Sequence, residues 1–180
     1  MRRLSCKIIL TVSILILIGC AAITVPEWNP VYTPPPPQHV KNTLEITAPY
    51  DDVRRAVVRV YADRNITIKT IEKDSGLVAS EDMRLSMSEF LQYMTPGKYD
   101  IDQAYSIRPR GQVLRTNIFV EEMGNNGTVV RINLKGTVGW EAAYQNYPYY
   151  HKPELGLTEC QSTGKLEAAL FKEILAKVAH

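Results

Sequence analysis

The side chains best suited to covalent chemistry are three cysteines and three histidines. Cys160 and His151 lie nine positions apart, and a thiol beside an imidazole is the pairing that activates a nucleophilic cysteine. The spacing assigns no third group to orient the imidazole and no oxyanion donor. The pattern therefore favours a protein that is not an enzyme, and a thiol enzyme using Cys160 is the weaker alternative.

The sequence lacks the motifs that usually bind metal ions, phosphates or nucleic acids. The sequence has no His-x-x-x-His, no closely paired cysteines and no glycine-rich phosphate loop, so we expect no metal and no cofactor. The adjacent carboxylates Asp51-Asp52 and Glu121-Glu122 would point to opposite faces of a strand, which favours surface and capping roles. No basic cluster indicates binding to nucleic acid.

A short aromatic segment, residues 140–153, is the best candidate for recognition. Tyrosine and tryptophan offer large contact areas with few rotatable bonds and a polar tip, which suits binding to a protein or glycan. We predict a loop here that binds a partner. The alternative is a tyrosine-rich loop that folds onto its own sheet. The candidate side chains are Trp140, Tyr144, Tyr147, Tyr149 and Tyr150.

The N-terminus has the pattern of a signal peptide. Residues 1–7 are basic, residues 8–18 are apolar, and Gly19 precedes Cys20. A small residue at this place suits cleavage by a signal peptidase. The sequence therefore predicts a signal peptide over residues 1–19, with Cys20 as the first residue after cleavage.

The Leu-Ile-Gly-Cys ending at Cys20 resembles the lipobox of bacterial lipoproteins. That resemblance implies that the Cys20 thiol is diacylated, that the chain is cut before it, and that its new amino group takes a further acyl chain such as palmitate. Two or more chains hold a protein on a bilayer stably. The alternative is an uncleaved anchor, because residues 8–25 carry no charge and reach the lower length limit for a membrane-spanning helix. In both cases the basic start stays in the cytoplasm and the rest lies outside it.

The remaining chain divides into a linker and a folded domain. Removing residues 1–19 from the 180 leaves 161, with 18 basic and 19 acidic side chains. Residues 20–42 contain a run of four prolines, which favours an extended polyproline II linker. If largely extended, it would reach on the order of 60 Å, and Trp28 and Tyr32 would suit the membrane interface. Residues 43–180 are long enough for one domain with its own core. There Cys160 is expected to be a partly buried residue, with a redox or dimerising role as the alternative.

Hydrophobic spacing predicts a strand first and a helix last in this domain. A helix is expected to open at Pro49, and another to begin after an N-cap at Ser162 or Thr163. Between them we expect several antiparallel strands and one or two helical turns ended by Pro96-Gly97. Strands are predicted at 43–47, 66–71, 77–85, 104–108, 112–123 and 129–138, with turns at 73–76 and 124–127.

One antiparallel sheet with both helices on one face would bury the apolar side of each element. We therefore predict an α+β two-layer sandwich. Three stretches of this domain are informative: APYDDV at 48–53, IEKDSGLV at 71–78 and CQSTGKLE at 160–167. With this order of elements, they look like the helix-grip domains of small envelope lipoproteins, among them the outer-membrane assembly lipoprotein BamC. Relatives of this kind often have a second cysteine in the middle region, which this chain lacks.

The resemblance implies a lipid-anchored protein with a non-catalytic periplasmic domain that binds or braces an envelope protein complex. Ala21, rather than an aspartate, follows Cys20. In lipoproteins this favours an outer-membrane anchor facing the periplasm. The alternative function is a binding module for an apolar small molecule or lipid held between the sheet and the helices, which requires a cavity there.

Overall fold

The chain folds into helices and antiparallel strands arranged in two layers. A computed structural model describes residues 30–100, 105–124, 126–144 and 154–179. Seven strands form one antiparallel sheet in the order β3-β4-β7-β8-β9-β5, with β2 also paired to β8. In chain order the elements are β1 (Val31–Thr33), β2 (Thr43–Ile46), α2 (Tyr50–Asp63), β3 (Ile68–Glu72), β4 (Leu77–Ser80), α3 (Met87–Tyr93), β5 (Met94–Pro96), β6 (Lys98–Asp100), β7 (Tyr105–Met123), β8 (Gly127–Tyr144), β9 (Glu154–Ser162) and α4 (Lys165–Val178).

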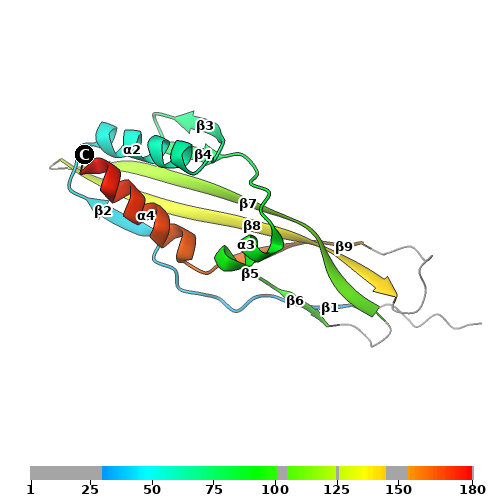
Figure 1. The fold of residues 1–180 in the computed structure, drawn as a ribbon. Helices are drawn as coiled ribbons and strands as arrows, with labels where there is room; N and C mark the ends of the chain where they lie inside the picture. Colours follow the sequence, from blue (N-terminus) through cyan, green and yellow to red (C-terminus); the bar gives the residue numbers. More distant parts are fainter. Residues whose placement is uncertain (1–29, 101–104, 125, 145–153, 180) are drawn as a thin grey trace, which may run out of the picture.

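The helices α2 and α4 lie next to each other on one face of the sheet (Figure 1). This confirms the predicted α+β two-layer sandwich with an N-terminal and a C-terminal helix on the same face. Pro49 occupies the N-cap position of α2, and Asp51 and Asp52 lie in its first turn, where negative charge suits the helix dipole.

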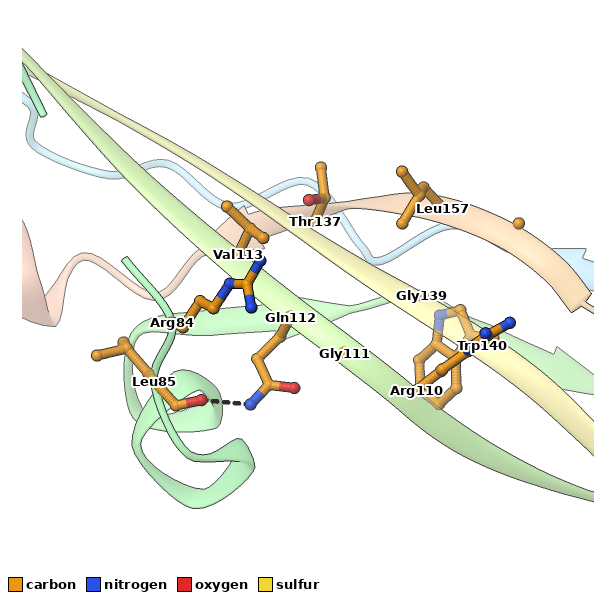
Figure 2. Close-up of a pocket in the computed structure, with 11 residues that line it drawn as sticks. Arg84, Leu85, Arg110, Gly111, Gln112, Val113, Thr137, Gly139, Trp140 and Leu157 are labelled. Atoms are coloured by element: carbon orange, nitrogen blue, oxygen red, sulfur yellow. Dashed lines mark hydrogen bonds between the residues drawn. The ribbon is translucent and has the colours of Figure 1, made fainter. Parts of the chain in front are cut away.

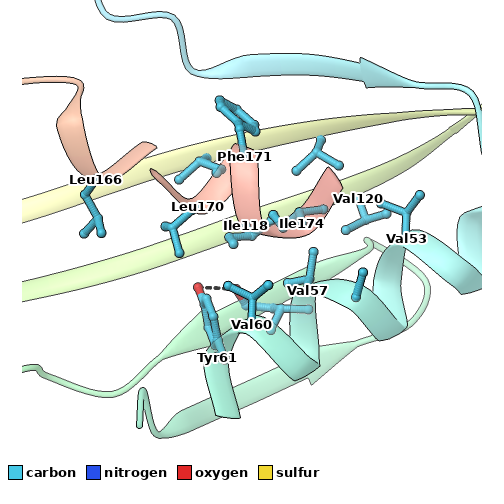
Figure 3. Packing of buried hydrophobic residues seen from close by; sticks show 14 of the residues in the cluster. Val53, Val57, Val60, Tyr61, Ile118, Val120, Leu166, Leu170, Phe171 and Ile174 are labelled. Carbon is cyan, nitrogen blue, oxygen red and sulfur yellow. Dashed lines mark hydrogen bonds between the residues drawn. The ribbon is translucent and has the colours of Figure 1, made fainter. Parts of the chain in front are cut away.

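The core fills the space between these helices and the sheet (Figure 3). From α2, Val53, Val57 and Val60 recur at helical spacing and are fully buried. Leu170 and Ile174 of α4 are fully buried in the same cluster. Burying side chains of this size stabilises the fold by about 1.5–3 kcal/mol each.

The long hairpin formed by β7 and β8 lies at the centre of the sheet. Its two strands pair from Met123↔Gly127 to Tyr105↔Tyr144. The strand predicted at 104–108 is confirmed from Tyr105, but it is not separate from the one predicted at 112–123, because β7 is continuous and a bulge between Pro109 and Gly111 accommodates the proline. The predicted loop at 140–153 was wrong at its start, since β8 runs on to Tyr144.

Three other boundaries differ from expectation. The strand predicted at 77–85 ends at Ser80. The helical turns end at Tyr93 rather than at Pro96-Gly97, because Met94–Pro96 pairs with β9 as a strand. The helix α4 follows Gly164, whose φ of 80° only glycine adopts without strain, so neither Ser162 nor Thr163 is its N-cap.

Four of the described strands were not predicted. The strand β5 lies at the end of the segment expected to form helical turns and β6 follows it, β9 was missed, and β1 lies inside the segment predicted as a linker. In β1, Val31–Thr33 pairs with Lys98–Asp100 of β6 as a separate two-stranded ribbon. Part of the proline-rich segment, Val31–Thr33, therefore belongs to the folded structure.

Candidate functional site

The candidate site lies at the end of the β7–β8 hairpin that is away from its turn. Trp140 stands on β8 opposite Gly156 of β9. Its indole Nε1 donates a hydrogen bond of 2.8 Å to Thr158 Oγ1. Alternation along β8 puts Trp140 on the same face as the buried Val138, so its ring belongs to the helix side of the sheet.

Trp140 is part of an aromatic cluster with Tyr99 and Tyr32. The Tyr99 ring meets the Trp140 ring edge to face at a centroid distance of 6.3 Å and an angle of 72°. The rings of Tyr32 and Tyr99 also lie next to each other, with a centroid distance of 5.0 Å. Such pairs contribute about 0.5–1.5 kcal/mol beyond their buried area. The aromatic cluster therefore joins β1, β6 and β8.

Hydrogen bonds hold the two tyrosines against β9. Tyr99 Oη donates to the Leu155 carbonyl at 3.2 Å, and Tyr32 Oη donates to the Glu159 carbonyl at 3.5 Å. Burial, more than any nearby charge, raises the pKa of Tyr32. The β1–β6 ribbon is thus fastened to the main sheet by side chains.

A shallow depression of about 710 Å³ lies beside the cluster, across β7, β8 and β9 (Figure 2). Its floor contains Gly111 and Gly139, which face each other across the β7–β8 ladder and have no side chains to fill it. We call it the arginine groove. Its other lining residues include Arg84, Leu85, Arg110, Gln112, Trp140 and Leu157.

The two sides of the arginine groove differ in their lining residues. On one side Arg84 and Leu85 lie beside β7, where Gln112 Nε2 donates a hydrogen bond to the Leu85 carbonyl (Figure 2). On the other side Leu157 of β9 is 78% exposed. The lining residues include two arginines and no acidic side chain. The groove therefore combines basic and apolar side chains.

The structure places two of the five predicted recognition residues. Trp140 is partly buried in the aromatic cluster, and Tyr144 lies on β8 opposite Tyr105. Tyr147, Tyr149 and Tyr150 lie outside the described residues, as does Cys20. Sequence reasoning missed Tyr99 altogether and assigned Tyr32 to the membrane interface. Each of these two tyrosines lies in a strand of only three residues. A sequence pattern that short does not predict a site without knowledge of the fold.

Cys160 is partly buried on β9, as one interpretation of the sequence had it. Burial raises the pKa of its thiol to about 11, and the Glu159 carboxylate adds to the effect. A nucleophilic cysteine needs the opposite, a lowered pKa and positive neighbours. His151 lies outside the described residues, so the predicted Cys160–His151 pair stays a prediction.

The volume between sheet and helices, where the alternative of an apolar ligand would need a cavity, is occupied by the buried core cluster. The arginine groove lies elsewhere, across β7, β8 and β9. A second depression of about 450 Å³ lies beside the turn between β3 and β4, and its lining includes Asp74 and Glu122. Neither depression coincides with the predicted apolar ligand site.

Within the described ranges, no group of three or more metal-ligating side chains comes together. None of the helices in these ranges has the length and apolar character needed to cross a membrane. No known protein family and no curated protein matches this sequence.

Proposed function

We propose that the protein is a lipoprotein anchored through Cys20, with a non-catalytic domain that binds or braces a protein complex of the cell envelope. The signal sequence and the lipobox support the anchor, and the residue after Cys20 favours the outer membrane with the domain in the periplasm. The domain has the two-layer architecture expected of a helix-grip protein. Cys160, with its raised pKa, supplies no thiolate for catalysis at neutral pH.

The observation that carries this proposal is the docking of β1 on the aromatic cluster. Because Tyr32 is held there, the tether that would link a lipid at Cys20 to β1 spans residues 20–30. Eleven residues reach on the order of 35 Å at most. The 19-residue strand β7 is about 60 Å long. The tether therefore keeps the end of the hairpin that carries the arginine groove near the membrane.

A short tether and an exposed groove suit a protein that presents one end to an envelope partner. A linker over residues 20–42 would let the domain move far from the membrane, whereas one over residues 20–30 keeps the arginine groove close to it. Leu157 stands exposed at that place and shares the groove lining with Trp140, and aromatic residues surrounded by a polar rim are typical of protein interfaces.

The anchor is tested by replacing Cys20 with alanine. We expect the variant to accumulate as an unprocessed precursor that incorporates no labelled palmitate. Normal maturation of the variant would refute the lipid anchor and leave the partner-binding part to be judged separately.

Partner binding is tested by photo-crosslinking in cells, with a crosslinking amino acid in place of Leu157. Met123 at the hairpin turn, also exposed, is the matched control position. We expect a discrete envelope-protein adduct from position 157 and none from position 123. The same experiment in a Tyr147→Ser, Tyr149→Ser, Tyr150→Ser variant tests the predicted tyrosine loop. No specific adduct from position 157 would refute the partner.

A further inference from the structure

The segment between β1 and β2 contains four consecutive prolines, Pro34–Pro37. It connects the β1–β6 ribbon to β2 along one side of the domain (Figure 1). We call residues 34–42 the proline strap. Proline fixes its own φ at about −65° and keeps the residue before it out of the helical region. The run therefore forms a polyproline II helix, which has three residues per turn and no internal hydrogen bonds.

The domain holds the proline strap at both ends. Before the prolines, β1 is paired with β6 over three residues. After them, Val40 lies next to Gly164 at the start of α4, where an added Cβ would be 3.3 Å from Val40 Cγ1. Ile132 N–H then donates to the Asn42 carbonyl at 2.8 Å. A partner would thus bind a segment whose ends are already fixed, which lowers the entropy cost of binding.

The exposure of the four proline rings shows which side of the strap faces the solvent. Pro35 is half-buried, whereas Pro34, Pro36 and Pro37 are exposed. With three residues per turn, Pro34 and Pro37 lie on one ridge of the helix. Pro36 shares another ridge with His39, which is also exposed. The strap therefore turns one ridge toward the domain and two toward the solvent.

The outward surface of the strap restricts the chemistry of a partner. Prolines have no N–H, so the run can only accept hydrogen bonds, through its carbonyl oxygens. Among the described residues, none donates to the carbonyls of Pro34–Pro37. The rings beside these oxygens are apolar and carry no charge. Tryptophan and tyrosine match such a surface, because each combines a flat apolar ring with an N–H or O–H donor at its edge.

We propose that the proline strap is the ligand of a protein partner whose binding groove is lined by aromatic side chains. The two outward ridges would enter the groove, and Pro34 and Pro37 have the P-x-x-P spacing that aromatic-lined grooves recognise. The polyproline II helix is already formed before binding, which favours this mode of recognition. The inference goes beyond the proposed function, because it requires neither a lipid at Cys20 nor the arginine groove.

Two substitutions distinguish contact by the outward rings from stiffness of the strap. Pro37→Ala removes an exposed ring, and Pro35→Ala removes the half-buried one. Each replaces one proline of the same run, so both loosen the backbone to a similar extent. We expect Pro37→Ala to weaken partner binding about tenfold, because the methylene groups of its ring are no longer buried in the groove. Pro35→Ala should stay within about twofold of the unmodified protein.

The experiment is photo-crosslinking in cells from position 39 of the full chain, where the exposed His39 follows the prolines at a distance of two residues. We expect one discrete protein adduct. Mass spectrometry should locate the crosslink in a peptide of the partner that contains tryptophan or tyrosine. In the same background, Pro37→Ala should reduce the adduct about tenfold and Pro35→Ala by no more than about twofold.

Competition with a synthetic peptide keeps the test valid even if Pro37→Ala displaces the strap. The peptide has the sequence of residues 33–39, TPPPPQH, and is added to permeabilised cells before irradiation. It should suppress the adduct of the unmodified strap. The same peptide with Pro37→Ala should need about tenfold higher concentration for equal suppression.

Four outcomes would overturn the proposal and leave the strap as a spacer. They are no adduct from position 39, equal effects of the two substitutions, no competition by the peptide, and a crosslink to a peptide without an aromatic residue. Adducts from position 157 report on the arginine groove and not on the strap. Failure of this inference is therefore distinct from failure of the proposed function.

Discussion

Arg64 of α2 donates two hydrogen bonds to the carboxylate of Glu173 and so links α2 to α4. Its Nε lies 2.8 Å from Oε2, and its Nη2 lies 2.7 Å from Oε1. The hydrogen bonds from Arg64 lower the pKa of the Glu173 carboxyl, and those to Glu173 raise the pKa of Arg64. The pair fixes the two helices side by side over the sheet.

We predict that Glu173→Gln lowers the free energy of unfolding at pH 7 by about 0.5–1 kcal/mol, since the pair is partly exposed. The folded pKa of Glu173 lies below its unfolded value, so the contribution is present above about pH 4.5 and is lost as the pH falls through the folded pKa. Urea unfolding at pH 7 and pH 3 measures this. The difference between the two proteins should be smaller at pH 3.

A matched control uses the exposed pair Lys135–Glu159, in which the Glu159 side chain is 78% exposed. Glu159→Gln should change the free energy of unfolding by less than about 0.5 kcal/mol at both pH values. A Glu173→Gln effect that is the same at pH 3 and pH 7 would show that charge pairing does not cause it.

Tyr61 gives a second, opposite pH dependence. Its hydroxyl lies 2.6 Å from Thr116 Oγ1 inside the core, and burial raises its pKa to about 12. The folded pKa is above the unfolded value of about 10, so the stability linked to this proton is complete below pH 10 and is lost as the pH rises toward 12. Relative to Tyr61→Phe, the unmodified protein should lose about 2–3 kcal/mol over this range.

Denaturant unfolding at pH 9, 10, 11 and 12 follows this loss. At pH 7 Tyr61→Phe itself should be less stable by about 1–2 kcal/mol, because Thr116 loses its hydroxyl partner. Tyr50→Phe is the control, since the Tyr50 hydroxyl donates to Lys73 at the surface. Parallel curves for the unmodified protein and Tyr61→Phe above pH 10 would contradict the assignment.

The docking of Tyr32 depends on the absence of a side chain at Gly97. A Cβ there would lie 2.3 Å from Tyr32 Oη and 2.6 Å from its ring. Gly97→Ala should therefore release β1 from β6 while leaving the core in place. We expect faster amide exchange across residues 31–33 and no change in α2. Gly111→Ala is the control, because nothing lies within 4 Å of its added Cβ.

The architecture was predictable where burial follows a local pattern. The valines of α2 recur at helical spacing, and the turn at Gly76 was correctly predicted because its φ of 66° suits glycine. The strand β9 was not predictable in this way. It buries polar Thr158 and exposes apolar Leu157, which inverts the usual alternation.

The candidate site was harder to predict, because its parts come from distant segments. Trp140 was selected from its residue type, and the structure places it in a cluster. Its partners Tyr32 and Tyr99 belong to three-residue strands, which are too short to show periodicity. The arginine groove depends on where the chain leaves β7 after Met83, and only tertiary structure determines that.

The Cys160 thiol should be slow to react. With a pKa of about 11, only about one thiol in ten thousand is ionised at pH 7, and the thiolate is the reactive form. Alkylation by iodoacetamide should keep accelerating up to pH 10, without a plateau near pH 8–9. The protein unfolded in urea is the control and should react with an ordinary cysteine profile. A plateau near pH 8 in the folded protein would contradict the prediction.

Glu167 is the one polar side chain in the described core with an unpartnered oxygen. The residue is 2% exposed, and its Oε2 accepts no hydrogen bond from any described residue. An unsatisfied buried group of this kind costs about 1–3 kcal/mol. Glu167 lies in the first turn of α4, where a negative charge interacts favourably with the helix dipole and offsets about 0.3–1 kcal/mol of this cost.

We therefore predict that Glu167→Met, which has a similar length and no polar oxygen, raises the free energy of unfolding by about 1 kcal/mol. Glu167→Gln keeps a buried polar group and should gain less. Glu159→Met removes the same charge from an exposed site and should change stability by less than about 0.5 kcal/mol. Urea unfolding of the three variants at pH 7 decides the matter. A loss of stability in Glu167→Met would mean that the carboxylate makes a favourable contact at the start of α4, and that its burial is not a net cost to the fold.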